Sequence, residues 1–177
     1  TVFMNEAVEY GATFDISNDS STQKVVVNFV DEDNSIVGEE AFMNPANSEE
    51  FTIGYYLSKD LGTFDLDFGF RLDQIERSGS VSEEEHEDDH GDDHGDEHGD
   101  VDYYNIDDTT SSFAITLGRD LSDNLGISLG YASVERLPSS IELFMNGPHM
   151  ATGRFEVGDP NLNSETSNNF DITFNFD

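Results

Sequence analysis

The chain has 177 residues, enough for one ordinary domain, and its 39 acidic residues against 7 basic ones give a net charge of −32. This charge makes nucleic acid a poor partner, disfavours anionic membrane surfaces and favours cations. The absence of cysteine excludes disulfides and thiolate metal sites, and no apolar run is long enough for a transmembrane helix.

Seven segments alternate between apolar and polar residues, as β-strands with one apolar and one polar face do. The clearest is 63–73, in which Phe64, Leu66, Phe68, Phe70 and Leu72 share one face. No helix is predicted, so the sequence indicates an all-β, antiparallel fold. In chain order, the predicted strands are 8–16, 22–30, 51–57, 63–73, 113–117, 125–131 and 170–176.

The connections between these strands alternate in length. In an up-and-down sheet, such alternation places every short turn at one end and every long loop at the other. Outer-membrane barrels have this asymmetry, so the pattern predicts a transmembrane β-barrel with external long loops. A soluble antiparallel sandwich also alternates, and it is the alternative. The short connections are 17–21, 58–62 and 119–124, and the long ones are 31–50, 74–111 and 135–169.

The number of strands is odd. Bacterial single-chain barrels have an even number of strands, and an open sheet edge cannot lie in lipid. Seven strands, with the last one ending at the C-terminus, therefore predict that residues 1–177 are a fragment of a larger barrel. A soluble sandwich would need no missing parts.

A tract rich in histidine and aspartate, EEEHEDDHGDDHGDEHGDVD at 83–102, lies in the second long loop. Imidazole is a favoured ligand of zinc, copper and nickel, and carboxylates can complete the coordination shell. Because regularly placed glycines and dense like charge oppose a helix, we expect a loop that wraps a cation. The predicted metal ligands are His86, His90, His94, His98, Asp89, Asp93 and Asp96.

This tract predicts metal capture rather than catalysis, because a catalytic zinc site needs three rigid ligands and an ordered surrounding shell. Protons compete with the metal for imidazole, so binding should weaken below about pH 6. The residues do not fix the metal, since copper binds most tightly to such ligands in vitro. A solvated acidic loop with incidental histidines is the alternative. No nucleophile–base pair is evident, and no enzymatic activity is expected.

Two short motifs occur in the last long loop, ERLPSSIELF at 135–144 and GDPNLNSE at 158–165. Together with VGEEAFMNP at 37–45 and the His/Asp tract, they resemble TonB-dependent outer-membrane receptors of the zinc-uptake type. The residues of the last loop that match are Glu135, Arg136, Pro138, Glu142, Leu143, Phe144, Gly158, Asp159, Pro160, Asn161, Leu162 and Glu165.

The resemblance implies a 22-stranded barrel around an N-terminal plug in the outer membrane of a bacterial cell. It implies import of zinc as the substrate, with the lipid bilayer, the divalent metal ion and the TonB energy-coupling protein as partners. The plug and the remaining strands would then lie outside residues 1–177. A soluble secreted β-protein that binds metal is the alternative from a different class.

Haem is the other ligand that the resemblance suggests. Haem receptors of the superfamily place a histidine between an arginine–proline box and an NPNL box, and His149 lies in that interval. We therefore predict His149 as a zinc ligand or an axial haem ligand, which would make haem or a metal chelate the alternative cargo. A loop histidine hydrogen-bonded to backbone is the alternative.

Overall fold

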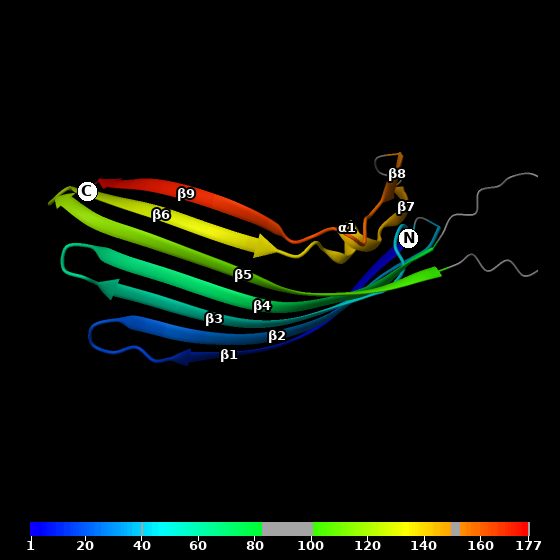
Figure 1. Cartoon of the computed structure of the whole chain (residues 1–177), viewed down its shortest axis with the longest axis horizontal. Coiled ribbons are helices and arrows are strands. Elements are labelled where there is room, and N and C mark those ends of the chain that lie inside the picture. Colours follow the sequence, from blue (N-terminus) through cyan, green and yellow to red (C-terminus); the bar gives the residue numbers. More distant parts are fainter. Residues whose placement is uncertain (40, 83–100, 150–152, 177) are drawn as a thin grey trace, which may run out of the picture.

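Seven long strands form one antiparallel sheet in the order β1-β2-β3-β4-β5-β6-β9 (Figure 1). This computed structural model describes residues 1–39, 41–82, 101–149 and 153–176. The prediction of seven antiparallel strands is confirmed. The strands are β1 (Val2–Asp15), β2 (Thr22–Val37), β3 (Ala46–Asp60), β4 (Asp65–Ser82), β5 (Val101–Ser122), β6 (Leu125–Arg136) and β9 (Glu165–Phe176).

The two kinds of connection lie at opposite ends of the sheet. The short turns that join β1 to β2, β3 to β4 and β5 to β6 lie together at the left of Figure 1, which we call the turn end. The long connections lie at the other end, the loop end. The sorting of connections by length, expected for an up-and-down sheet, is therefore present.

One face of the sheet is apolar across all seven strands. Residues directly opposite one another in neighbouring strands share a face, so the register assigns each side chain to one side. Many large side chains of this apolar face are exposed; the exposed fraction is 68% for Tyr10 and 80% for Phe170. A surface this large and apolar fits the hydrocarbon of a bilayer better than it fits water. Two of its cross-strand rows are Phe14–Val25–Tyr55–Phe70–Phe113 and Phe68–Ile115–Tyr131–Phe170.

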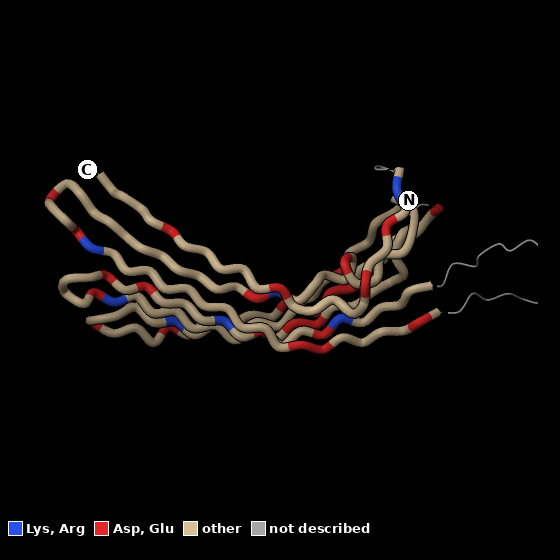
Figure 2. Tube along the Cα trace, turned by 45° about the horizontal axis from the view of Figure 1, so that its top comes forward, with Lys and Arg blue, Asp and Glu red and all other residues tan. Residues whose placement is uncertain are grey.

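The strands extend further towards the loop end than the sequence predicts. β4 continues to Ser82 and β5 begins at Val101, so residues 74–82 and 101–111 of the expected loop 74–111 are paired strand. Residues 31–37 and 46–50 of the expected loop 31–50 are also strand. There the apolar alternation stops, because carboxylates replace the apolar side chains while the backbone pairing continues (Figure 2).

The last long loop, expected at 135–169, contains regular structure between β6 and β9. It folds into the short helix α1 (Ser140–Phe144) and a separate hairpin of β7 (Asn146–His149) and β8 (Arg154–Val157). The expectation of no helix is wrong at α1. Its signal was in the sequence, since Ser139 and Glu142 have the spacing of a capping box. None of the described helical residues forms a helix that could cross a membrane.

A small apolar core lies at the loop end, on the polar face of the sheet. The aromatic ring of Phe144 packs directly over Gly79 of β4, where a Cβ would lie 2.4 Å from a ring carbon. Gly79 is on the same face as Arg71 and Arg77 of β4, because they are separated by even numbers of residues. The loop therefore folds over the polar face. The core consists of Ile36, Met43, Ala46, Leu143 and Phe144.

Candidate functional site

The predicted metal-binding tract begins and ends at neighbouring positions of the loop end. Ser82, the last residue of β4, lies opposite Val101, the first residue of β5. The seven predicted ligands between them, at 86–98, lie outside the described residues. Among the residues that the structure does describe, no group of three or more histidines and carboxylates is placed to hold a metal ion.

His149 is the eighth predicted ligand. Its backbone ends β7, opposite Arg154 of β8, so it lies in the hairpin at the loop end. The base of this hairpin contacts the end of β4, immediately before the His/Asp tract, because the Asn146 side chain donates a hydrogen bond to the Ser82 carbonyl at 2.6 Å. His149 and the tract therefore emerge from the same region of the molecule.

A second asparagine reinforces this region. The Asn44 side chain donates to the hydroxyls of Ser80 and Ser82, both at 3.1 Å. The connection between β2 and β3 and the base of β7 thus both hold the end of β4. Sequence reasoning did not single out Asn44 or Asn146, since an asparagine in a loop carries no signal of its distant partners.

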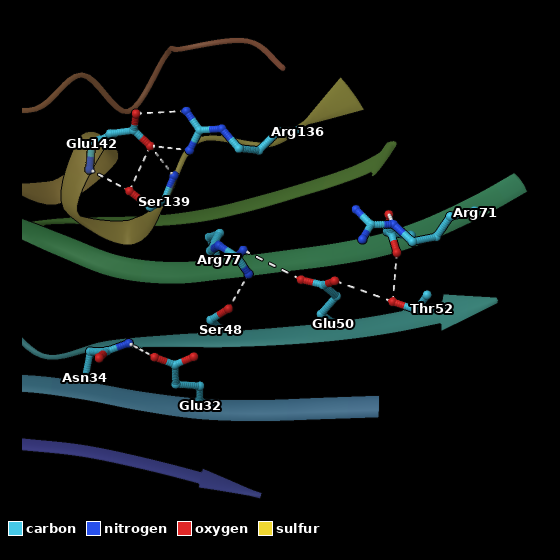
Figure 3. A network of polar contacts seen from close by, with 11 residues as sticks. Glu32, Asn34, Ser48, Glu50, Thr52, Arg71, Arg77, Arg136, Ser139 and Glu142 are labelled. Carbon is cyan, nitrogen blue, oxygen red and sulfur yellow. Dashed lines mark hydrogen bonds and ion pairs between the residues drawn. The ribbon is translucent and has the colours of Figure 1, made fainter. Parts of the chain in front are cut away.

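The motif residue Arg136 joins three separate elements, and Figure 3 shows its pair with Glu142 of α1. Its guanidinium donates to both carboxylate oxygens of Glu142 in α1, at 2.8 and 3.0 Å, and to Glu165 of β9 at 2.8 Å. Such two-pronged charge-assisted pairs are strong and directional. Glu142 also accepts from the Ser139 backbone and side chain, which completes the capping box of α1. The first motif is therefore a clamp that fixes α1 to the sheet.

The second motif folds back on the first. Gly158 donates to the carbonyl of Met145, and Asp159 donates to the carbonyl of Glu142 at 3.0 Å. A Cβ at Gly158 would lie 2.7 Å from that same Glu142 oxygen, so the close approach requires glycine. The Asp159 side chain accepts from the Asn161 backbone at 2.9 Å, which forms the turn expected for this segment.

We expect the Arg136→Met substitution to loosen this loop without unfolding the sheet. It keeps an unbranched apolar stem and removes three hydrogen bonds, but Arg136 is half exposed, so the loss should be about 1 kcal/mol. Amide exchange protection across 137–164 should fall about fivefold. Arg119→Met at the turn end is the control and should leave that protection unchanged; equal protection in the Arg136 variant would contradict the clamp.

The clamp should also weaken in acid. Hydrogen bonds from Arg136, and then those from Ser139, lower the pKa of Glu142 from 4.5 to about 2. A lowered pKa stabilises the folded loop above pH 4.5, and this stabilisation is lost as the pH falls from 4.5 towards 2. Protection factors of residues 137–145, corrected for intrinsic exchange, should decline over that window. In Glu142→Gln they should be lower and nearly independent of pH there; a parallel decline in both proteins would refute this role.

The sheet, its apolar face and the clamped loop now have a counterpart among known proteins. The sequence profile described as TonB dependent receptor-like, beta-barrel matches residues 5–177. The chain belongs to this family of outer-membrane β-barrels.

A solved structure supports the same fold. The chain is similar to a double mutant of the Serratia marcescens haemophore receptor HasR, solved in complex with its haemophore HasA and haem. The TM-score is 0.60 at 15% sequence identity, with 98% of this chain and 29% of that chain covered. The chain thus spans less than a third of that receptor, and the likeness concerns the fold alone.

Proposed function

We propose that this chain belongs to an outer-membrane receptor that captures a divalent metal ion, most specifically zinc, at the cell surface for TonB-driven import. The observation that carries the proposal is the tract at 83–102, with its four histidines at every fourth position among carboxylates. Its ends lie at the loop end of the sheet, next to the hairpin that carries His149. In an outer-membrane barrel the long loops face the cell exterior.

The chemistry of the residues assigns each part of the receptor a role in metal capture. The net charge of −32 attracts cations towards the receptor. The ligands in the tract are His86, His90, His94 and His98 with Asp89, Asp93 and Asp96. His149 is a further metal ligand at the loop end. Zinc is the transported substrate, and TonB is the energy-coupling partner across the periplasm.

Deleting residues 83–102 tests the capture role. Zinc titration calorimetry of the complete receptor in detergent at pH 7.5 should lose its multiple-site binding, and uptake by cells in scarce zinc should fall, while the barrel still folds. A receptor with His86, His90, His94 and His98 all replaced by asparagine keeps the charge of the tract and should lose most of the binding too. Unchanged calorimetry and uptake in both variants would reject zinc capture by this tract.

Haem is the second candidate cargo. Two observations favour it: the likeness in fold to a receptor solved with haem, and the position of His149 between the two motifs of the last loop. Imidazole is an axial ligand of haem iron, and its binding shifts the Soret band. A haem titration with a Soret shift that His149→Ala abolishes would support this cargo; the same spectrum with and without His149 would reject it.

A further inference from the structure

A cavity of about 330 Å³ lies at the loop end, between the polar face of the sheet and the segments that fold over it. One wall is apolar, formed by Ile36, Phe42 and Met43 with Phe3 of β1. The rings of Phe3 and Phe42 lie with centroids 6.0 Å apart. The first residues of α1 close another side, among them Ser140.

The floor of the cavity carries two opposite charges on either side of a small residue. Glu32 of β2 lies opposite Ser48 of β3, which lies opposite Arg77 of β4. Two strand spacings separate the backbones of Glu32 and Arg77 by about 10 Å. Figure 3 shows the three side chains on successive strands. Among the described residues no ion pair joins Glu32 to Arg77, because Ser48 separates them.

Arg77 is partly buried, and its ion pair with Glu50 is long. Its side chain is 13% exposed, it donates to the Ser48 hydroxyl, and its nearest carboxylate oxygen, on Glu50, is 4.0 Å away. Arg136, by contrast, is 50% exposed and has three hydrogen bonds to carboxylates. A partly buried guanidinium with one long ion pair can bind a second carboxylate at hydrogen-bond distance, so an anionic group in the cavity would strengthen its pairing.

The Glu32 carboxylate is oriented by two asparagines. One of its carboxylate oxygens accepts hydrogen bonds from the side chains of Asn5 and Asn34, which fixes the orientation of the group. Within the described part of the chain, its other oxygen has no hydrogen-bond partner. With Glu32 and Glu50 near one arginine, a simple anion would meet net negative charge, and a simple cation would meet Arg77.

We propose that this cavity binds a zwitterionic aminocarboxylate with an apolar side chain. The ligand's carboxylate pairs with Arg77 and its ammonium with Glu32, above Ser48. Its apolar part packs against Phe3, Phe42 and Met43. A ligand with both charges pairs with both Arg77 and Glu32, whereas a ligand with one charge pairs with one of these side chains and is repelled by the other. This inference goes beyond metal capture and stands or fails independently of it, since it uses none of residues 83–102.

Three probes with one aromatic skeleton test the proposal on the complete receptor in detergent: L-phenylalanine, 3-phenylpropanoate and 2-phenylethylamine. Saturation-transfer NMR titrations should give binding of L-phenylalanine at least tenfold tighter than that of the other two. Arg77→Gln and Glu32→Gln should each weaken L-phenylalanine binding at least tenfold. Arg71→Gln, an arginine of β4 on the same face but outside the cavity, should not.

Arg77→Lys keeps the receptor testable if the glutamine variant does not fold. It retains the charge and loses the planar fork, so binding should weaken less than in Arg77→Gln but measurably. Equal affinity for the three probes, no binding of any of them, or wild-type affinity in the Arg77 or Glu32 variants would each overturn the proposal.

Discussion

The Ile115→Arg substitution is expected to destabilise the folded barrel in lipid by about 2–4 kcal/mol. Ile115 lies at the middle of the apolar stretch of β5, opposite Phe68 on one side and Tyr131 on the other. An arginine there would place a charge in the hydrocarbon, where neither neighbour can pair with it. Denaturant titration of the receptor folded into lipid vesicles measures the loss.

The neighbouring residue supplies a matched control. Thr116 points to the other face of the same strand, opposite Asp67 and Gly130. Thr116→Arg adds the same side chain one position along, next to a carboxylate, so it should cost less than about 1 kcal/mol. Similar losses in the two variants would mean that the apolar face does not contact lipid.

The Gly79→Ala substitution is expected to undock α1 from the sheet, with a loss of about 1–3 kcal/mol. The added methyl group would lie 2.4 Å from a carbon of the Phe144 ring, which is itself fully buried and cannot move aside. Amide exchange across 137–145 would report the loosened helix. Combining Gly79→Ala with Phe144→Leu should recover part of the loss, because the smaller side chain leaves room for the methyl group.

Gly69→Ala is the control for this substitution. Gly69 belongs to the same strand, but nothing lies within 4 Å of the position that its Cβ would occupy. Exchange across 137–145 should therefore match the wild type. If both alanine variants exposed α1 equally, the effect would come from the strand and not from the packing of Phe144.

The sheet was accessible to sequence reasoning because a bilayer imposes a simple rule on it. Phe64, Leu66, Phe68, Phe70 and Leu72 alternate cleanly since one face must be apolar. Where β4 leaves the apolar stretch, Gln74 and Glu76 take the place of apolar residues on that face. The backbone pairing of β4 continues there although the apolar alternation has stopped. Because the strands were predicted from that alternation alone, the predicted strands ended too early.

The structure of the last loop was harder to predict, because the residues that it contacts are distant in the sequence. Both motifs of the last loop can be recognised in the sequence. An ion pair between Arg136 and a nearby carboxylate can also be expected from the sequence. Its bond to Glu165 depends on the register of β6 and β9, and the packing of Phe144 depends on a glycine in another strand. The metal ligands at 86–98 lie outside the described residues, so their grouping stays a prediction from spacing and chemistry alone.

The position of the clamp closes the last loop at its two ends. Arg136 and Glu165 are directly opposite each other in the register, so the strand scaffold already brings the two ends of the loop together and the ion pair closes them. Residues 136–165 could therefore be grafted onto another hairpin of similar register with little extra loop-closure entropy. The recipient would need two features that this sheet supplies: a glycine or an equally small residue under the Phe144 ring, as at Gly79, and an apolar surface like that of Ile36, Met43 and Ala46.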